Sequence, residues 1–290
     1  MSETGTASRQ LFRSDPAAEL RGAVLGYRGF RFAARGPRRR LVVPDGVVKV
    51  MLGFGGPLDM VDAVEPRTVT TATSLVNGLR TTAAIGVHRG LLHGVTVLLS
   101  PPAAYRLFGV PMAEWAHITL DPGDLLGHGL GQLTERLAEC PDWPARFALL
   151  DHALAARLRS GPRCHPEVAW AWGELRRTDG RIRIDDLAAG TGWSRRHLER
   201  RFREQLGPTP KGAAQVLRLQ AALRLKQSGM SWTLAATGAG FHDQAHFSHT
   251  FGTMIGCTPG RFHDARSSGG GPDDSLDFLP EHVTSILLAH

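Results

Sequence analysis

The pattern of hydrophobic positions changes period along the chain. From Val24 to about Gly109, short apolar runs rich in Val, Leu and Thr are separated by turn residues such as Gly-Pro and Pro-Asp-Gly. Runs of this length with regular breaks are typical of a small antiparallel barrel or sandwich. The strands that this pattern predicts are 24–32, 39–44, 47–54, 67–76, 81–87 and 93–100.

Beyond this region the apolar residues recur at intervals of three and four, as at Phe147, Leu150 and Leu154. Such spacing predicts amphipathic helices over 125–137 and 144–158. From Pro166 onward every segment has a helical pattern, with proline at a favourable first helical position. The fold class is therefore expected to be α+β: an amino-terminal antiparallel β barrel or sandwich with helices, then an all-α domain.

The helical half contains a near-repeat. Residues 184–207 (IDDLAAGTGWSRRHLERRFREQLG) and 231–256 (SWTLAATGAGFHDQAHFSHTFGTMIG) each predict a helix, a glycine-containing turn and a second helix. This order is the helix-turn-helix motif. Between the two copies, Thr209 is expected to cap a helix that starts at Pro210 and runs to about Gln227.

The second helix of each copy has one apolar face and one polar face. In the first copy Ser194 is a natural N-cap, and Leu198 and Phe202 fall on one side of the helix. The opposite side carries Arg196, Glu199, Arg200 and Arg203. A guanidinium on such a face can bind guanine O6 and N7 together in a DNA major groove. In the second copy Phe247 and Phe251 face inward, whereas Ala245, Ser248 and His249 face outward.

The positive charge of the chain is concentrated around this repeat. The 290 residues include 34 Lys and Arg and 27 Asp and Glu, but residues 181–266 alone hold 13 basic and 6 acidic residues. The rest of the chain holds 21 of each. An ordinary solvated helix face would also carry arginines, but the duplication and the localised charge together favour a module that binds a polyanion.

Residues 166–262 resemble the DNA-binding domain of AraC/XylS-type bacterial transcription regulators. The resemblance rests on LAAGTGWSRRHLERRFREQLGPTP (187–210), LRLQAALRL (217–225) and GFHDQAHFSHTFGTMIGCTPGRF (240–262). It implies two helix-turn-helix units that read adjacent major-groove segments, with positions 196, 199 and 200 and positions 244, 245, 248 and 249 reading bases. The predicted DNA-binding residues are Ser194, Arg195, Arg196, Glu199, Arg200, Arg203, Gln244, Ala245, Ser248 and His249.

Three positions of the second unit depart from the pattern of the family. His249 stands where an arginine is common, Ala235 replaces a branched apolar residue, and Gly238 is expected to weaken its helix by ~1 kcal/mol relative to alanine. We therefore expect the first unit to dominate base recognition, and the second to contribute backbone contacts and register.

The front of the chain is less informative. The resemblance implies a cupin-like barrel that senses a small molecule or serves dimerisation, and the helices at 125–158 could either close over the barrel or pair two chains. His88 and His93 could be metal ligands, but their spacing without a carboxylate pair favours structural roles. A cluster of aromatic residues could line an apolar pocket or fill a core: Tyr27, Phe30, Phe32, Tyr105 and Phe108.

Three scattered cysteines predict a reducing compartment, and we find no signal peptide, membrane span or catalytic residue set. We therefore expect a cytoplasmic, nucleoid-associated regulator without catalytic activity, metal or cofactor. Its expected partners are double-stranded promoter DNA, RNA polymerase, a small-molecule effector and a second copy of the chain.

The alternatives are a cupin-like enzyme or ligand-binding module with a DNA-binding appendage, and an architectural protein that coats DNA. The expected boundaries are a flexible start (1–20), a β-rich regulatory domain (21–115), a helical linker or dimerisation region (116–163), the DNA-binding domain (164–266) and a Gly-rich linker with an acidic tail (267–290).

Overall fold

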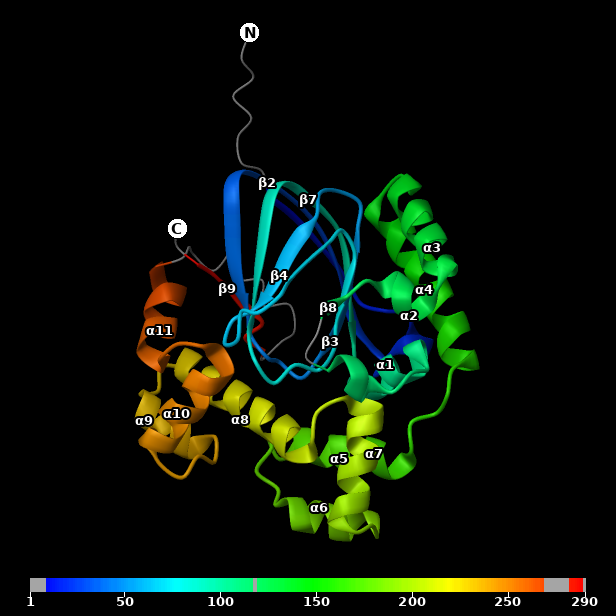
Figure 1. Cartoon of the computed structure of the whole chain (residues 1–290). Coiled ribbons are helices and arrows are strands. Elements are labelled where there is room, and N and C mark those ends of the chain that lie inside the picture. Colours follow the sequence, from blue (N-terminus) through cyan, green and yellow to red (C-terminus); the bar gives the residue numbers. More distant parts are fainter. Residues whose placement is uncertain (1–8, 117–118, 269–281, 289–290) are drawn as a thin grey trace.

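The computed structural model describes residues 9–116, 119–268 and 282–288. Its strands form one antiparallel sheet that curls into a barrel, with helices beside it and below it (Figure 1). The sheet order is β1-β2-β7-β3-β6-β8; in addition β4 pairs with β7, β5 pairs with β4, and β9 pairs with β2. The strands are β1 (Arg9–Ser14), β2 (Val24–Val42), β3 (Val48–Gly53), β4 (Leu58–Asp62), β5 (Val69–Ala72), β6 (Leu75–Asn77), β7 (Ala84–Leu99), β8 (Thr119–Leu120) and β9 (Ser285–Leu287).

Two long strands replace four of the predicted short ones. The segments expected at 24–32 and 39–44 belong to β2, and those at 81–87 and 93–100 belong to β7. Gly36 and Pro37 do not interrupt β2 because they lie in a register shift between Ala34 and Arg38, where the ladder makes no pairs. A proline is tolerated there because its missing N–H costs no ladder hydrogen bond.

The two ends of the chain also differ from expectation. The expectation of a loose segment over residues 1–20 is wrong for Arg9–Ser14, which pairs along β2 as β1. Most of the expected Gly-rich linker and acidic tail (267–290) lies outside the described residues. Residues 282–284 are not helical and Ser285–Leu287 is strand β9. The sequence pattern also fails to predict strand β4.

The helices beside the barrel bury their apolar stripes against it. They are α1 (Pro101–Phe108), α2 (Pro122–Leu126), α3 (His128–Glu139) and α4 (Trp143–Ser160), with 3-10 turns η1 (Ala18–Leu20) and η2 (Met112–Trp115). Phe147, Leu150 and Leu154 of α4 share a core with Val50 and Val97 of the sheet. Of the two arrangements open for this stripe, α4 therefore takes the one that closes over the barrel.

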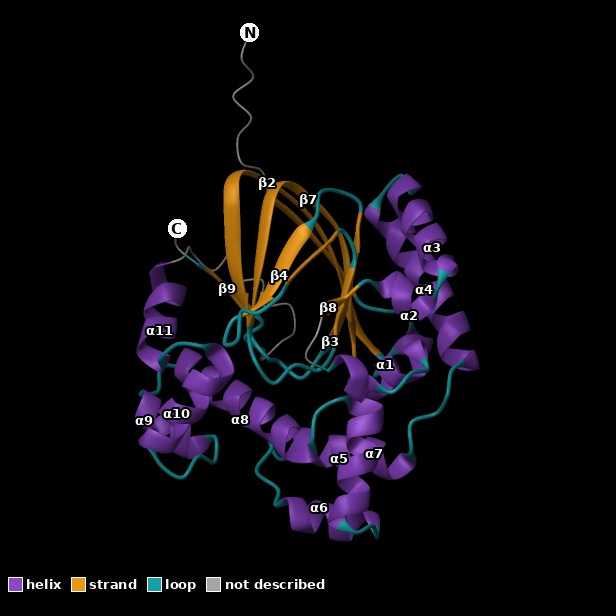
Figure 2. Ribbon diagram, in the orientation of Figure 1, coloured by secondary structure: helices purple, strands orange, loops and turns teal. Residues whose placement is uncertain are grey.

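The helical half of the chain lies below the barrel. Its helices are α5 (Pro166–Arg177), α6 (Ile184–Thr191), α7 (Arg195–Leu206), α8 (Pro210–Gln227), α9 (Trp232–Gly238), α10 (Gln244–Ile255) and α11 (Pro259–Ser268). Helix α8 has α6 and α7 at one end and α9 and α10 at the other (Figure 2). Thr209 caps α8 as predicted, since its hydroxyl accepts a hydrogen bond from Gly212 N at 3.0 Å.

The barrel and the helical half share apolar cores instead of meeting through a polar linker. Leu41, Val43 and Ala83 of the barrel pack in one cluster with Phe241 and Phe251 of the second unit. Leu79 packs with the first unit. Shared burial of this kind makes the position of each helix-turn-helix unit depend on the barrel above it.

Candidate nucleic-acid interface and barrel cavity

Helix α7 presents a row of arginines on the side opposite its buried face. Leu198 and Phe202 are fully buried, whereas Arg196, Arg200 and Arg203 are exposed. Ser194 caps the helix as predicted, because its hydroxyl accepts from His197 N at 3.3 Å. The predicted residues Ser194 and Arg195 are exposed at the start of the helix, and Glu199 is half-buried.

The arginines on α7 differ in their surroundings. Arg195 forms an ion pair with Asp185 of α6 at 3.3 Å, and Arg200 lies 3.5 Å from His197 Nδ1. Among the described residues, Arg196 and Arg203 form no ion pair within 4 Å. These two side chains are therefore free to contact an external anion. A wide hollow runs along this face and is bounded on its far side by Glu114 of η2.

Helix α10 repeats the architecture with different side chains. Phe247 and Phe251 are fully buried, and Asp243 caps the helix by accepting from His246 N at 2.7 Å. This backbone hydrogen bond, together with one from His242, lowers the pKa of Asp243.

The predicted contact residues of α10 also lie on its outer surface. Gln244, Ala245 and His249 are exposed, and Ser248 is half-buried. Gln244 is held against α9 because its Oε1 accepts from Thr233 Oγ1 at 2.8 Å. The structure thus places nine of the ten predicted residues on the two second helices and Ser194 at the N-cap of α7, and the arginines among them all lie on α7.

Gly238 occupies a different position from the one expected. It is the last residue of α9, so the penalty for glycine inside a helix does not apply in full. A Cβ there would lie 2.9 Å from Leu225 Cδ1 of α8, and Ala235 is fully buried beside it. Small residues at these two positions allow α9 to pack closely on α8.

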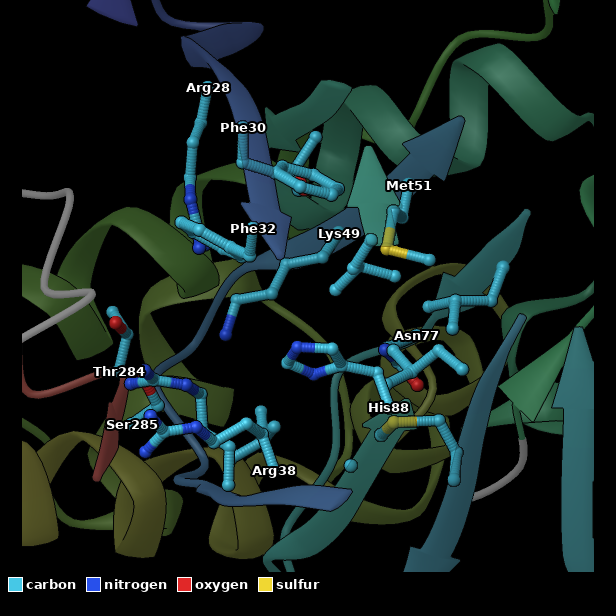
Figure 3. Close-up of a pocket in the computed structure, with 18 of the residues that line it drawn as sticks. Arg28, Phe30, Phe32, Arg38, Lys49, Met51, Asn77, His88, Thr284 and Ser285 are labelled. Carbon is cyan, nitrogen blue, oxygen red and sulfur yellow. The ribbon is translucent and has the colours of Figure 1, made fainter. Parts of the chain in front are cut away.

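The barrel encloses a cavity of about 320 Å³ (Figure 3). Phe30, Phe32 and Met51 contribute apolar walls, and Lys49 and His88 point into the space. Of the two roles left open for the five aromatic residues, Phe30 and Phe32 line the cavity and the other three belong to a core. The other three predicted aromatics face the helices: Tyr27 stacks on Phe147 of α4 and donates to Asp151, Phe108 packs against Trp115, and Tyr105 packs at the same core.

The charged residues around the cavity are nearly all basic. Arg9, Arg28, Arg38, Arg40 and Lys49 line it, and Asp45 is the only carboxylate among the described lining residues. Asp45 is already engaged, since it pairs with Lys49 at 2.5 Å and accepts from Val47 N. Sequence reasoning missed these basic residues because a run of arginines is usually solvated; only the strand register shows which of them face inward.

The basic residues around the cavity affect the pKa values of the groups that line it. Burial lowers the pKa of Arg28, and the charges of Arg40, Arg9 and Arg13 lower it further. Burial also lowers the pKa of His88, with Arg40 and Arg38 acting in the same direction. Within the described part of the chain, the buried Nε2 atom of His88 has no hydrogen-bond partner. The described lining of the cavity is therefore mostly basic, and one buried polar atom in it has no partner among the described residues.

His88 and His93 are not brought together as metal ligands. His93 packs against Phe54 and Trp143, away from the cavity that His88 faces. Over the ranges that the structure describes, no group of three or more His, Cys, Asp or Glu side chains is placed to hold a metal ion. No helix in those ranges is long and apolar enough to cross a membrane.

Two helix-turn-helix units on one connecting helix define a DNA-binding protein of the double helix-turn-helix class. Comparison with known families matches residues 187–265 to a helix-turn-helix domain. The probable transcription factor PqrA of Proteus vulgaris is 35% identical over 107 residues, which are 37% of this chain and 84% of that protein. The chain belongs to the AraC/XylS family of transcription regulators.

Other similarities are shorter or more distant. The uncharacterized regulator YbfI of Bacillus subtilis is 38% identical over 65 residues, which are 22% of this chain and only 24% of that protein. The structure of ToxT from Vibrio cholerae aligns with 88% of this chain and 97% of its own, with 9% identity and a TM-score of 0.47.

Proposed function

We propose that this transcription regulator recognises a specific promoter sequence by placing α7 and α10 in adjacent major-groove segments. The observation that carries the proposal is the exposed row Arg196, Arg200 and Arg203 on α7, opposite the buried Leu198 and Phe202. The same apolar anchor lies beneath α10. Two reading helices fixed on α8 would match successive turns of the duplex, about 34 Å apart.

The ten exposed or half-buried residues divide by chemistry. Arg196 and Arg200 suit guanine contacts, with Glu199 between them as an acceptor for cytosine N4. Ser194, Arg195 and Arg203 suit phosphates at the groove edge. On α10, Gln244 suits adenine, Ala245 a thymine methyl group, and Ser248 and His249 the backbone.

The test is a measured binding site and its single-base variants. The site is first selected from random duplexes, and affinities are then compared at one stated salt concentration. Arg200→Ala should reduce discrimination at one base pair by ~1–3 kcal/mol and leave the other positions unchanged. Arg177→Ala is the matched control, because this arginine pairs with Glu174 on α5 and is not among the predicted contacts.

Equal weakening on every sequence would make Arg200 a phosphate contact instead of a reading residue. No preference for the selected site over random DNA would contradict sequence-specific binding as a whole, and would favour a protein that coats DNA.

We further propose that the barrel senses a small-molecule effector. A cavity of about 320 Å³ with apolar walls and a few inward polar groups supports this role over a barrel that serves only for dimerisation, because its own side chains leave the interior unfilled. The regulator would then act on promoters together with RNA polymerase in the cytoplasm, as a monomer or as a homodimer.

A further inference from the structure

The hollow along the arginine row of α7 has a second wall, and the barrel half of the chain supplies it. This wall is lined by Pro111, Ala113 and Glu114 of the turn η2. All three of these residues are exposed. A molecule that contacts the arginines of α7 therefore comes close to a part of the chain that lies outside both helix-turn-helix units.

The turn η2 is held in place by buried residues on either side of Glu114. Met112 and Trp115 are 1% and 2% exposed, and both belong to the core that joins the sheet to α4. The Trp115 ring meets Phe108 of α1 edge-on, with the ring centroids 5.0 Å apart. The backbone at Glu114 therefore cannot move away from α7 without opening this core.

The same turn packs on the C-terminal end of α7. Gly207, which ends the helix, has a φ of 102°, and a Cβ there would lie 3.1 Å from Ala116 Cβ and 3.3 Å from Met112 O. Helix α7 also contacts α1, and Figure 1 shows its upper end just below α1. The last turn of α7 contains Arg203, whose carbonyl accepts from Gly207 N at 2.9 Å. The turn η2 thus lies at the end of α7 that carries Arg203.

This end of a reading helix lies toward the DNA backbone. An α-helix with its side chains is about 10–12 Å across and a major groove is about 12 Å wide, so an inserted helix fills the groove and its neighbours meet the phosphates. Base edges are contacted from the N-terminal part of the helix. With α7 placed in the groove as proposed above, Arg203 and η2 both belong to the phosphate edge.

Glu114 is the only charged residue that the barrel half contributes to the described lining of the hollow. The other two carboxylates of this lining are on α7 itself. Glu204 pairs with Arg201 at 3.0 Å, and Glu199 is among the predicted base contacts. A carboxylate beside a phosphate adds a repulsion that does not depend on the base sequence and that salt screens.

We propose that the DNA interface of the first unit extends onto the barrel half at η2, where Glu114 faces the phosphate backbone and weakens binding equally on all sequences. This inference rests on the placement of α7 in the major groove proposed above. It gives the barrel half a part in DNA affinity that needs no ligand in the cavity. Its consequence is a lower affinity for non-specific DNA, for which phosphate contacts supply nearly all of the binding free energy.

The charge is tested by measuring the affinity of the full chain for the selected site and for a random duplex of the same length. Glu114→Gln removes the charge and keeps the shape, so it should tighten binding to both duplexes by about two- to fivefold at low salt and by less as the salt rises. Glu114→Lys should add a phosphate contact and steepen the slope of log affinity against log salt by about 0.9. Glu139→Gln is the matched control, because this exposed carboxylate lies on α3 and does not line the hollow.

The place of contact is tested on the unmodified chain, by hydrogen exchange with and without the selected duplex. Peptides that cover 109–116 should exchange more slowly when DNA is bound, together with those that cover 194–206. Peptides from α3 should not change and serve as the internal reference.

The inference and the proposed function fail in different ways. Slower exchange over 194–206 alone would place η2 outside the interface and overturn the inference, while leaving the DNA-binding role of α7 intact. No gain from Glu114→Gln, or an equal gain from Glu139→Gln, would also overturn it. A gain confined to the selected site would overturn the assignment to the backbone, since both duplexes have the same phosphates. If the unmodified chain showed no preference for the selected site, the proposed function itself would be contradicted.

Discussion

The two helix-turn-helix units have the same interior and different surfaces. Phe202 of α7 and Phe251 of α10 are both fully buried, and each helix begins at a side-chain N-cap. The outer face of α7 carries Arg196, Arg200 and Arg203, whereas the outer face of α10 carries small and weakly basic residues. A duplicated scaffold thus keeps its packing, because packing determines the fold, while the surface that meets DNA is free to diverge.

The largest effect should come from the shared interior. Phe202→Ala and Phe251→Ala each leave a large cavity in a fully buried site, and each should lower the free energy of unfolding by about 3–5 kcal/mol. Urea denaturation followed by circular dichroism measures both. A much smaller loss for Phe251→Ala would show that the second unit is packed more loosely than the first, so that the interiors of the two units are not equivalent.

The interior of each unit was largely predictable from the sequence, and the barrel was not. Ser194, Thr209 and the turn before α7 are encoded within a few residues of where they act, so the helices and their caps could be predicted. The lengths of β2 and β7 and the existence of β9 depend on strand partners far along the chain. No local pattern in residues 285–287 reveals that β2 lies ready to pair with them.

Of the two candidate sites, the DNA-facing surface of α7 could be predicted from the sequence and the barrel cavity could not. The arginines of α7 could be assigned to an outer face because a helix repeats every 3.6 residues. Arg28, Arg38 and Arg40 share one face of β2 with Phe30 and Phe32, but that this face lies inside the barrel follows only from the way the whole sheet curls. Basic side chains on a predicted strand are ordinarily taken as solvated, so the sequence does not predict that these arginines line a cavity.

A second comparison concerns glycines at equivalent positions. Gly190 of α6 and Gly238 of α9 each lie under a neighbouring side chain, the Trp170 ring in the first unit and the tip of Leu225 in the second. Gly190→Ala should cost about 1–3 kcal/mol because a Cβ would clash with a flat ring. Gly238→Ala should cost less than this, since Leu225 can shift and alanine favours the helix. Thermal unfolding of the two variants shows which substitution costs more stability, and a larger cost for Gly238→Ala would contradict this prediction.

The difference between the DNA-facing surfaces can be reduced by a single exchange. His249→Arg gives α10 the basic group that α7 already has, and it should tighten DNA binding by about 1 kcal/mol while leaving the fold unchanged. If the new arginine contacts a phosphate, the slope of log affinity against log salt should steepen by about 0.9. Filter binding at several salt concentrations measures both quantities. His242→Arg, also exposed but outside the predicted contacts, is the control, and an equal gain from it would show only a general effect of charge.

The smallest effect distinguishes the two N-caps by their chemistry. Ser194 does not titrate in this range, whereas the backbone N–H of His246 and the ring of His242 lower the pKa of Asp243 below its ordinary value of 3.8. A carboxyl group whose pKa is lower in the folded state stabilises the fold above the unfolded pKa, and this stabilisation is lost as the pH falls through the folded pKa. Asp243→Ala should therefore destabilise the protein at pH 6 and cost progressively less as the pH falls below 3.8, while the cost of Ser194→Ala should not change over this range. Denaturation of the two variants and the unmodified chain across this range gives the comparison, and a pH-independent cost at Asp243 would mean that its cap acts through geometry without its charge.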